Sequence, residues 1–223
     1  IEDGLKSKKQ DESFSSKEIY GEDMAQIIND KIDEYEKKIK GGSEDKDLLQ
    51  IWMILKILRE FRFRNETATL EFVDKKTYDE ELSKEGPNKR NLIVMAPGGW
   101  FISKNQYKTD KKYGELIIPL EGDILNDIQF YHSKVGDGML FKSSFQNGKR
   151  SKIMTPNALT KYMIKWSNKE LPPIILEDGS QKPRNLSTTM IVKVYESSEH
   201  GASKKKIIKD SKNRGNKPAT MHK

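Results

Sequence analysis

Residues 48–61 are the most constraining stretch of this sequence, because they are apolar on almost every side. A helix with so narrow a polar face is buried on several sides. The rest of the chain is strongly polar, with 34% charged residues and a mean hydropathy of −0.82. We therefore predict that this helix is the centre of the core, formed by Leu48, Leu49, Ile51, Trp52, Met53, Ile54, Leu55, Ile57, Leu58 and Phe61.

So wide an apolar surface needs more cover than one neighbouring helix can provide. Two arrangements satisfy this requirement: a sheet of the same chain covers the remainder, or a second subunit does. In the second arrangement the chain is a homo-oligomer, and the predicted interface residues are Leu48, Trp52, Leu55 and Leu58.

A second, amphipathic helix precedes this segment. Its apolar residues recur at steps of three or four, which is the spacing of one helix face. Gly41 and Gly42 end that helix, and Ser43 is the predicted N-cap of the apolar one. A link this short predicts two antiparallel helices, so residues 18–64 are expected to form a helical hairpin.

After Thr67 the pattern changes to short β-rich runs separated by Gly, Pro and Asn. Thr155 and Pro156 then have the cap and first-turn positions of a helix near 156–168. The predicted fold class is α+β, with the N-terminal hairpin followed by a mostly antiparallel β-sheet with one inserted helix, over residues 65–196. The expected strands are 67–73, 91–95, 100–102, 116–120, 128–131, 139–141, 174–176 and 190–195, and residues 75–84 suit a short helix.

Both ends of the chain are polar. Residues 1–17 form an acidic, polar arm, and residues 197–223 form a basic tail with eight Lys and Arg against two acids. We predict that both are disordered, because they cannot bury enough apolar surface to offset the entropy of ordering. The tail carries +6 of the net charge of +7, so the basic character of the chain is largely a property of its tail.

The composition also excludes several classes of site. Without cysteine, the chain cannot form disulfides, a Cys-ligated zinc site or a cysteine nucleophile. No apolar run reaches the length of about 18 residues that a membrane-spanning helix needs, so no transmembrane segment is predicted. We expect no metal ligands, no cofactor and no catalytic residues.

The basic tail is the main candidate for ligand binding. Its cations can displace the counterions of a polyanion and supply a salt-dependent affinity that does not depend on sequence. RNA, DNA and an anionic lipid surface are all polyanions that the tail could bind in this way. Two alternatives fit the same charges: a nuclear-import signal, and a solvated terminus that binds no ligand. The candidate nucleic-acid-binding residues here are Lys204, Lys205, Lys206, Lys209, Lys212 and Arg214.

Two further candidate contacts lie in the β-rich region. One is a cluster of cations after the predicted tight turn at Asn147-Gly148. The other interleaves aromatic and basic side chains, which can stack bases and hold phosphate, although a core role for Trp100 competes. The residues are Lys149, Arg150 and Lys152 in the first group, and Trp100, Tyr107 and Lys108 in the second.

Carboxylates near strand ends raise the alternative of a magnesium-dependent nuclease, which holds its metal with acids on adjacent strands. No motif fixes their spacing here, and His132 is expected to be a satisfied or exposed surface histidine. The carboxylates in question are Glu71 and Asp74, next to Lys75, and Glu121, Asp123 and Asp127.

Charge, rather than a motif, therefore supports the functional prediction. We expect a non-enzymatic structural protein that self-associates and binds nucleic acid or another polyanion through its basic tail. A matrix, coat or nucleocapsid-like protein or a ribonucleoprotein subunit would have this character, in the cytoplasm, the nucleus or a viral particle. The alternatives are a metal-dependent nuclease or other phosphate-handling enzyme, and an adaptor that docks a protein partner through the apolar helix.

Overall fold

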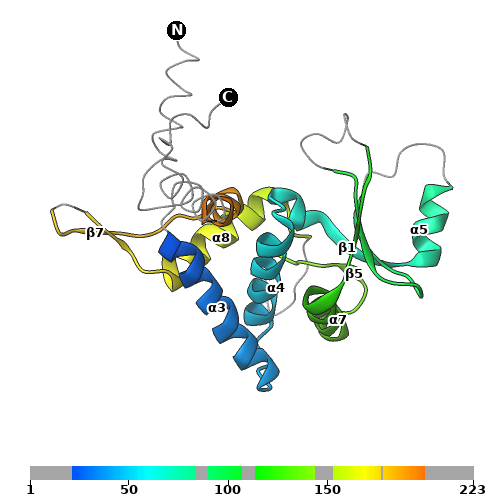
Figure 1. Ribbon diagram of the computed structural model, residues 1–223, viewed down its shortest axis with the longest axis horizontal. Coiled ribbons are helices and arrows are strands. Elements are labelled where there is room, and N and C mark those ends of the chain that lie inside the picture. Colours follow the sequence, from blue (N-terminus) through cyan, green and yellow to red (C-terminus); the bar gives the residue numbers. More distant parts are fainter. Residues whose placement is uncertain (1–21, 84–89, 107–113, 144–152, 177, 199–223) are drawn as a thin grey trace, which may run out of the picture.

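The computed structural model describes residues 22–83, 90–106, 114–143, 153–176 and 178–198 (Figure 1). Over these ranges the chain forms six α-helices and a mostly antiparallel five-stranded sheet. The N-terminal helices lie on one side of the molecule and the sheet on the other (Figure 1). The predicted α+β class, with an N-terminal helical pair, is confirmed.

The helical pair consists of α3 (Glu22–Lys40) and α4 (Lys46–Phe61), which run in opposite directions (Figure 1). Gly42 adopts a φ of 99° in the link, a region that favours glycine. Asp45, rather than the predicted Ser43, caps α4, because its Oδ1 accepts the backbone N–H groups of Asp47 and Leu48 at 2.9 and 3.1 Å. Ser43 Oγ instead accepts the N–H of Asp45 at 3.3 Å.

The sheet has the strand order β4-β3-β2-β1-β5. The β1–β2 pair is parallel, and the other three pairs are antiparallel. A short 3-10 helix, η1 (Asn65–Thr69), occupies the beginning of the first predicted strand. The strands are β1 (Leu70–Asp74), β2 (Asn91–Met95), β3 (Phe101–Lys104), β4 (Leu116–Pro119) and β5 (Gly138–Met139).

Helices cover both faces of the sheet. α5 (Lys75–Leu82) connects β1 to the parallel β2 and packs on one face, where Tyr78 joins Val73, Leu92 and Val94 in a small cluster. The other face of the sheet packs against the main core. Phe72 of β1 belongs to this core, and α7 (Gly122–Val135) contributes to it from outside the sheet. The sheet is therefore a middle layer between helices (Figure 1).

The apolar helix α4 lies at the centre of this main core. Trp52, Leu55 and Leu58 have no exposed surface within the single chain. α7 supplies part of the cover, since the ring of Phe130 packs edge-on against Trp52 with centroids 6.2 Å apart. The chain's own helices and sheet therefore bury these three residues, which is the first of the two predicted arrangements, and their interface role stays a prediction. Leu48 is half-buried.

Two predicted strands are helices in the structure. Residues 128–131 lie within α7, and residues 190–195 lie within a helix that spans 188–198. Their apolar side chains suggested strands, but the buried positions Ile128 and Tyr131, like Ile191 and Tyr195, recur at helical spacing. Packing against the core thus overrides the β-propensity of these residues, and the described part of the β-rich region contains two more α-helices than the short helix at 75–84 and the inserted helix that were expected.

The predicted inserted helix is α8 (Pro156–Glu170). Thr155 Oγ1 accepts the N–H of Ala158 at 3.1 Å, which confirms the predicted cap. β6 (Ile174–Ile175) and β7 (Gln181–Lys182) then pair as a hairpin that extends away from the body (Figure 1). Across the part of the chain that the structure describes, no helix is both long and apolar enough to span a bilayer.

Candidate functional site

Most of the predicted nucleic-acid-binding residues lie outside the described residues. This applies to the whole basic tail, to the turn after Asn147-Gly148 and to the second half of the aromatic and basic group. The residues concerned are Lys204, Lys205, Lys206, Lys209, Lys212, Arg214, Lys149, Arg150, Lys152, Tyr107 and Lys108.

Trp100 is described, and it packs against the edge of the main core. Its ring is half-buried, with centroids 6.2 Å from Phe72 and 5.6 Å from His132. The nearby Lys104 is 8% exposed, and its Nζ lies 2.8 Å from Glu66 Oε1. Both side chains therefore have partners within the chain, and the core interpretation of Trp100 accounts for its packing.

His132 has a carboxylate partner that the sequence did not reveal. Its Nε2 lies 2.7 Å from Asp137 Oδ1, across the turn that ends α7. Gly136 forms this turn with a φ of 75°. The histidine is thus a satisfied side chain at a helix end, as expected, with a partner that the sequence had not indicated.

The carboxylates of the nuclease alternative lie apart and have separate partners. Glu71 Oε2 is 3.0 Å from Arg90 Nη1, and Asp74 caps α5. Asp127 Oδ2 is 2.7 Å from Lys56 Nζ. Within the described ranges, no group of three or more His, Asp or Glu side chains is arranged to hold a metal ion.

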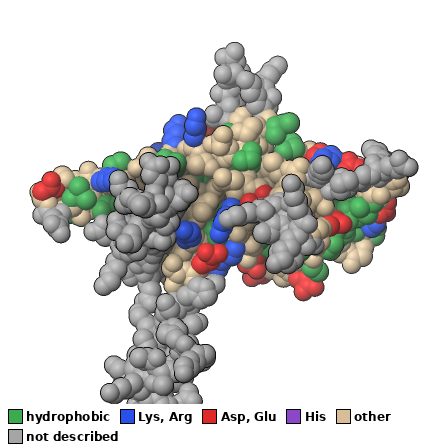
Figure 2. All heavy atoms as spheres, turned by 90° about the horizontal axis from the view of Figure 1, so that it is seen from above, with side chains coloured by type: hydrophobic (Ala, Val, Ile, Leu, Met, Phe, Trp, Pro, Cys, Tyr) green, Lys and Arg blue, Asp and Glu red, His purple; other side chains and the backbone are tan. Residues whose placement is uncertain are grey.

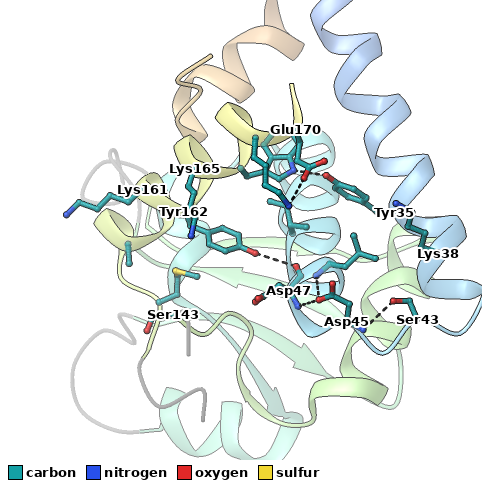
Figure 3. Close-up of a pocket in the computed structure, with 16 residues that line it drawn as sticks. Tyr35, Lys38, Ser43, Asp45, Asp47, Ser143, Lys161, Tyr162, Lys165 and Glu170 are labelled. Atoms are coloured by element: carbon teal, nitrogen blue, oxygen red, sulfur yellow. Dashed lines mark hydrogen bonds and ion pairs between the residues drawn. The ribbon is translucent and has the colours of Figure 1, made fainter. Parts of the chain in front are cut away.

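A pocket of about 750 Å³ lies between α8, the start of α4 and the second half of α3 (Figure 3). This volume falls in the range of about 300–1,000 Å³ that is typical of small-ligand sites. Three surfaces with different chemistry form the pocket: an aromatic wall, an acidic rim and a basic rim. The predicted interface residue Leu48 is one of its apolar lining residues.

The aromatic wall is fixed by hydrogen bonds between α8 and α3. Trp166 Nε1 donates to the hydroxyl of Tyr35 at 3.0 Å, and Tyr35 is hydrogen-bonded to Glu170. Burial raises the pKa of Tyr35 above its usual value, and the charge of Glu170 raises it further, so the hydroxyl stays protonated. Glu170 is in turn held 3.1 Å from Lys169 and 3.6 Å from Lys31.

The acidic rim is the beginning of α4. The exposed side chains of Asp45 and Asp47 line the pocket there, with Asp45 held as the helix cap. Tyr162 of α8 is half-buried, and its hydroxyl donates to the backbone carbonyl of Asp47 at 3.4 Å (Figure 3). This contact joins α8 to the start of α4 across the pocket.

The basic rim is formed by Lys161, Lys165 and Lys169, which we call the lysine row. These residues follow one another at four-residue steps along α8, a rise of about 6 Å each, and all three are exposed. Lys169 pairs with Glu170. Among the described residues, neither Lys161 nor Lys165 forms an ion pair.

Basic and acidic side chains are mixed over much of the surface. Seen from above, blue and red side chains lie close together near the middle of the molecule (Figure 2). Several lysines elsewhere are paired within their own helix, as Lys76 is with Glu80 of α5 at 3.8 Å. The lysine row differs, because α8 contains a single acid, Glu170, at its end.

Sequence reasoning found α8 but missed the lysine row. The signal was present, because the lysines alternate with the apolar stripe of the same helix and no acid lies between them. No protein-family model, curated protein or solved structure matches this chain, so its own residues and their geometry are the basis for any assignment of function.

Proposed function

We propose that this protein is a non-enzymatic nucleic-acid-binding protein that contacts the phosphate backbone through the lysine row of α8. One observation carries the proposal: three exposed cations project from one helix, and two of them have no ion-pair partner among the described residues. Each lysine that contacts a phosphate releases a counterion, which makes the affinity salt-dependent.

The spacing of the lysine row supports a strand as the ligand. Steps of about 6 Å along a helix axis are of the same order as the distance between neighbouring phosphates of an extended strand. Lysine contacts to phosphate position a protein without reading bases. We therefore expect little dependence on base sequence from these contacts alone.

The sequence supports the same class of ligand. The basic tail and the cations at 149–152 add charge of the same sign, so the lysine row is one part of a larger basic surface in this proposal. Self-association, as a matrix or coat protein requires, would have to use side chains other than Trp52, Leu55 and Leu58, because these three are fully buried within the single chain.

The proposal is tested with two variants that remove the same charge. In one, Lys161→Gln and Lys165→Gln neutralise the lysine row; in the control, Lys75→Gln and Lys76→Gln neutralise the paired lysines of α5. Anisotropy of a labelled 20-mer at several salt concentrations gives the affinity and its salt slope. We expect the slope to flatten in the first variant by about 1.8 units for a duplex probe or about 1.4 units for a single strand, and to stay unchanged in the control.

Equal losses in both variants would mean that only net charge matters and would contradict a contact at α8. No loss in either would remove the lysine row from the binding surface. A further arm uses vesicles that contain anionic lipid. Binding to these vesicles with no binding to the oligonucleotide would replace nucleic acid by a membrane surface as the ligand.

A further inference from the structure

We infer that the pocket beside the lysine row receives an unpaired nucleobase, so that the protein prefers single strands to duplexes. This inference rests on the proposed function, because it needs phosphates on the lysine row. It adds the form of nucleic acid that is bound and the residues that recognise it.

The first argument is position. Lys161 and Lys165 stand on the rim of the pocket, and Tyr162 of the same helix lies between them with its ring directed toward α4 (Figure 3). A strand held on the lysine row therefore passes the opening of a cavity of about 750 Å³. Sites of this size hold molecules larger than one base, so a base and its sugar fit.

The second argument is the aromatic ring. Tyr162 is half-buried, and its hydroxyl is bonded to the carbonyl of Asp47, so the ring is held in place from both ends. A base can stack on such a ring whatever its identity, because every base has a π-face. Apolar side chains, among them Leu48, Met154 and Ala158, complete this part of the lining.

The third argument is the separation of charge across the pocket. Lys161 and Lys165 stand on the α8 side, and Asp45 and Asp47 stand on the α4 side. The other charged lining residues have partners: Lys38 pairs with Glu34, and Lys169 pairs with Glu170. A simple anion would be attracted by one side and repelled by the other. A nucleotide suits both, because its phosphate is anionic and the amino groups of cytosine, adenine and guanine are donors that carboxylates accept.

Charge alone predicts the opposite preference. A duplex has a higher charge density than a single strand, and each phosphate contact contributes more to its salt dependence. The bases of a duplex are paired and stacked, and the pocket cannot receive them. Tighter binding of a single strand than of a duplex of equal length therefore reports on the pocket rather than on the lysine row.

The experiment compares a labelled oligodeoxycytidylate 20-mer with a 20-base-pair duplex at the same salt concentration. We expect the full chain to bind the single strand about tenfold more tightly. Tyr162→Ala should lower single-strand affinity by about 5- to 100-fold and leave duplex affinity unchanged. Tyr162→Phe keeps the ring, removes the hydroxyl that bonds to the Asp47 carbonyl, and should retain the preference.

A second variant acts without removing a packed ring. Ala158 is half-buried and lines the pocket, so Ala158→Phe fills the space that the base would occupy. We expect it to remove the single-strand preference and to leave the salt slope of duplex binding unchanged. Circular dichroism and thermal melting show that each variant is folded before its binding is measured.

The outcomes separate the two proposals. Equal affinity for single strand and duplex, with the loss from Lys161→Gln and Lys165→Gln intact, overturns the pocket inference and leaves the proposed function standing. Unchanged single-strand affinity in both Tyr162→Ala and Ala158→Phe overturns it as well. If the lysine variants have no effect on either probe, the proposed function itself fails.

Discussion

α3 and α8 are both rich in lysine, yet they use their lysines in opposite ways. On α3, Lys31 and Lys38 both pair with Glu34, at 3.0 and 2.6 Å. On α8, the single acid lies at the last position and leaves Lys161 and Lys165 without an acid three or four residues away. A helical lysine therefore either forms an ion pair within the fold, and is then committed to it, or stays available to a ligand. Which of the two applies depends on whether an acid lies one turn away.

α3 also takes part in an ion network with α4 and α7. Lys56 of α4 places its Nζ 2.6 Å from Glu36 of α3 and 2.7 Å from Asp127 of α7, and its side chain is 9% exposed. Lys40 pairs with the same Glu36. This ion network joins three helices, and its buried cation, Lys56, stabilises their arrangement, whereas Lys40 is 54% exposed at its edge.

The largest effect on stability is expected at Lys56, the lysine whose ion pairs are the most buried. Lys56→Met removes the buried cation that contacts Glu36 and Asp127 and leaves them only the half-exposed Lys40, and removing one member of a buried ion pair costs about 3–5 kcal/mol. Urea unfolding should show this loss in the free energy of unfolding. The double variant Lys56→Met, Asp127→Leu should recover most of it, because an apolar pair replaces the ionic one. Full stability in the single variant would contradict the committed role of Lys56.

The same network predicts a loss of stability in acid. Burial alone would raise the pKa of Glu36, but hydrogen bonds from Lys40 and Lys56 outweigh it and lower this pKa to about 2. Because the pKa in the folded state is depressed, the contribution is complete above the ordinary Glu pKa of about 4.3. It is lost as the pH falls from there toward 2. Urea midpoints between pH 6 and pH 2 should show this fall, with a weaker dependence in Lys56→Met.

A smaller effect is expected when α8 is made to resemble α3. Asn157→Glu places an acid four residues before Lys161, and Asn168→Glu places one three residues after Lys165; both positions are exposed. The two new pairs should lower nucleic-acid affinity by about 2- to 30-fold in total, since each exposed pair is worth about 0.2–1 kcal/mol. The control is Asn157→Gln with Asn168→Gln. Equal affinities of the two double variants would show that pairing does not decide availability.

The smallest effect is expected for a lysine that is paired but fully at the surface. Lys76 lies 3.8 Å from Glu80, with the two side chains 85% and 61% exposed. Lys76→Gln should change the free energy of unfolding by no more than about 0.5 kcal/mol and should leave oligonucleotide affinity unchanged. A marked loss of affinity would place α5 in the binding surface and weaken the contrast with α8.

Local signals in the sequence were enough to predict much of the fold. α8 begins where Thr155 and Pro156 predicted, because an N-cap and a first-turn proline act within a few residues. Residues 128–131 and 190–195 were wrong as strands, since their conformation depends on packing against distant elements. Asp45 was missed as the cap because Ser43 is also a good cap, and the two differ only in which backbone N–H groups they reach.

The candidate site was less accessible to sequence reasoning. The lysine row can be predicted from the sequence once α8 is recognised, whereas the pocket cannot. Its two sides meet where Tyr162 contacts Asp47, residues separated by 115 positions. No local pattern states that α8 lies against the start of α4, so the pocket follows only from the fold.

Trp166, which donates a hydrogen bond to Tyr35 in the aromatic wall, makes the tryptophan fluorescence of this protein sensitive to the pocket. Of the three tryptophans, Trp166 lines the pocket, whereas Trp52 has no exposed surface and Trp100 packs beside Phe72. A molecule that enters the pocket therefore alters the surroundings of one indole and leaves the other two unchanged. The intrinsic emission of this protein then reports occupancy directly, and Trp166→Phe would silence that signal while Trp100→Phe would only lower the background.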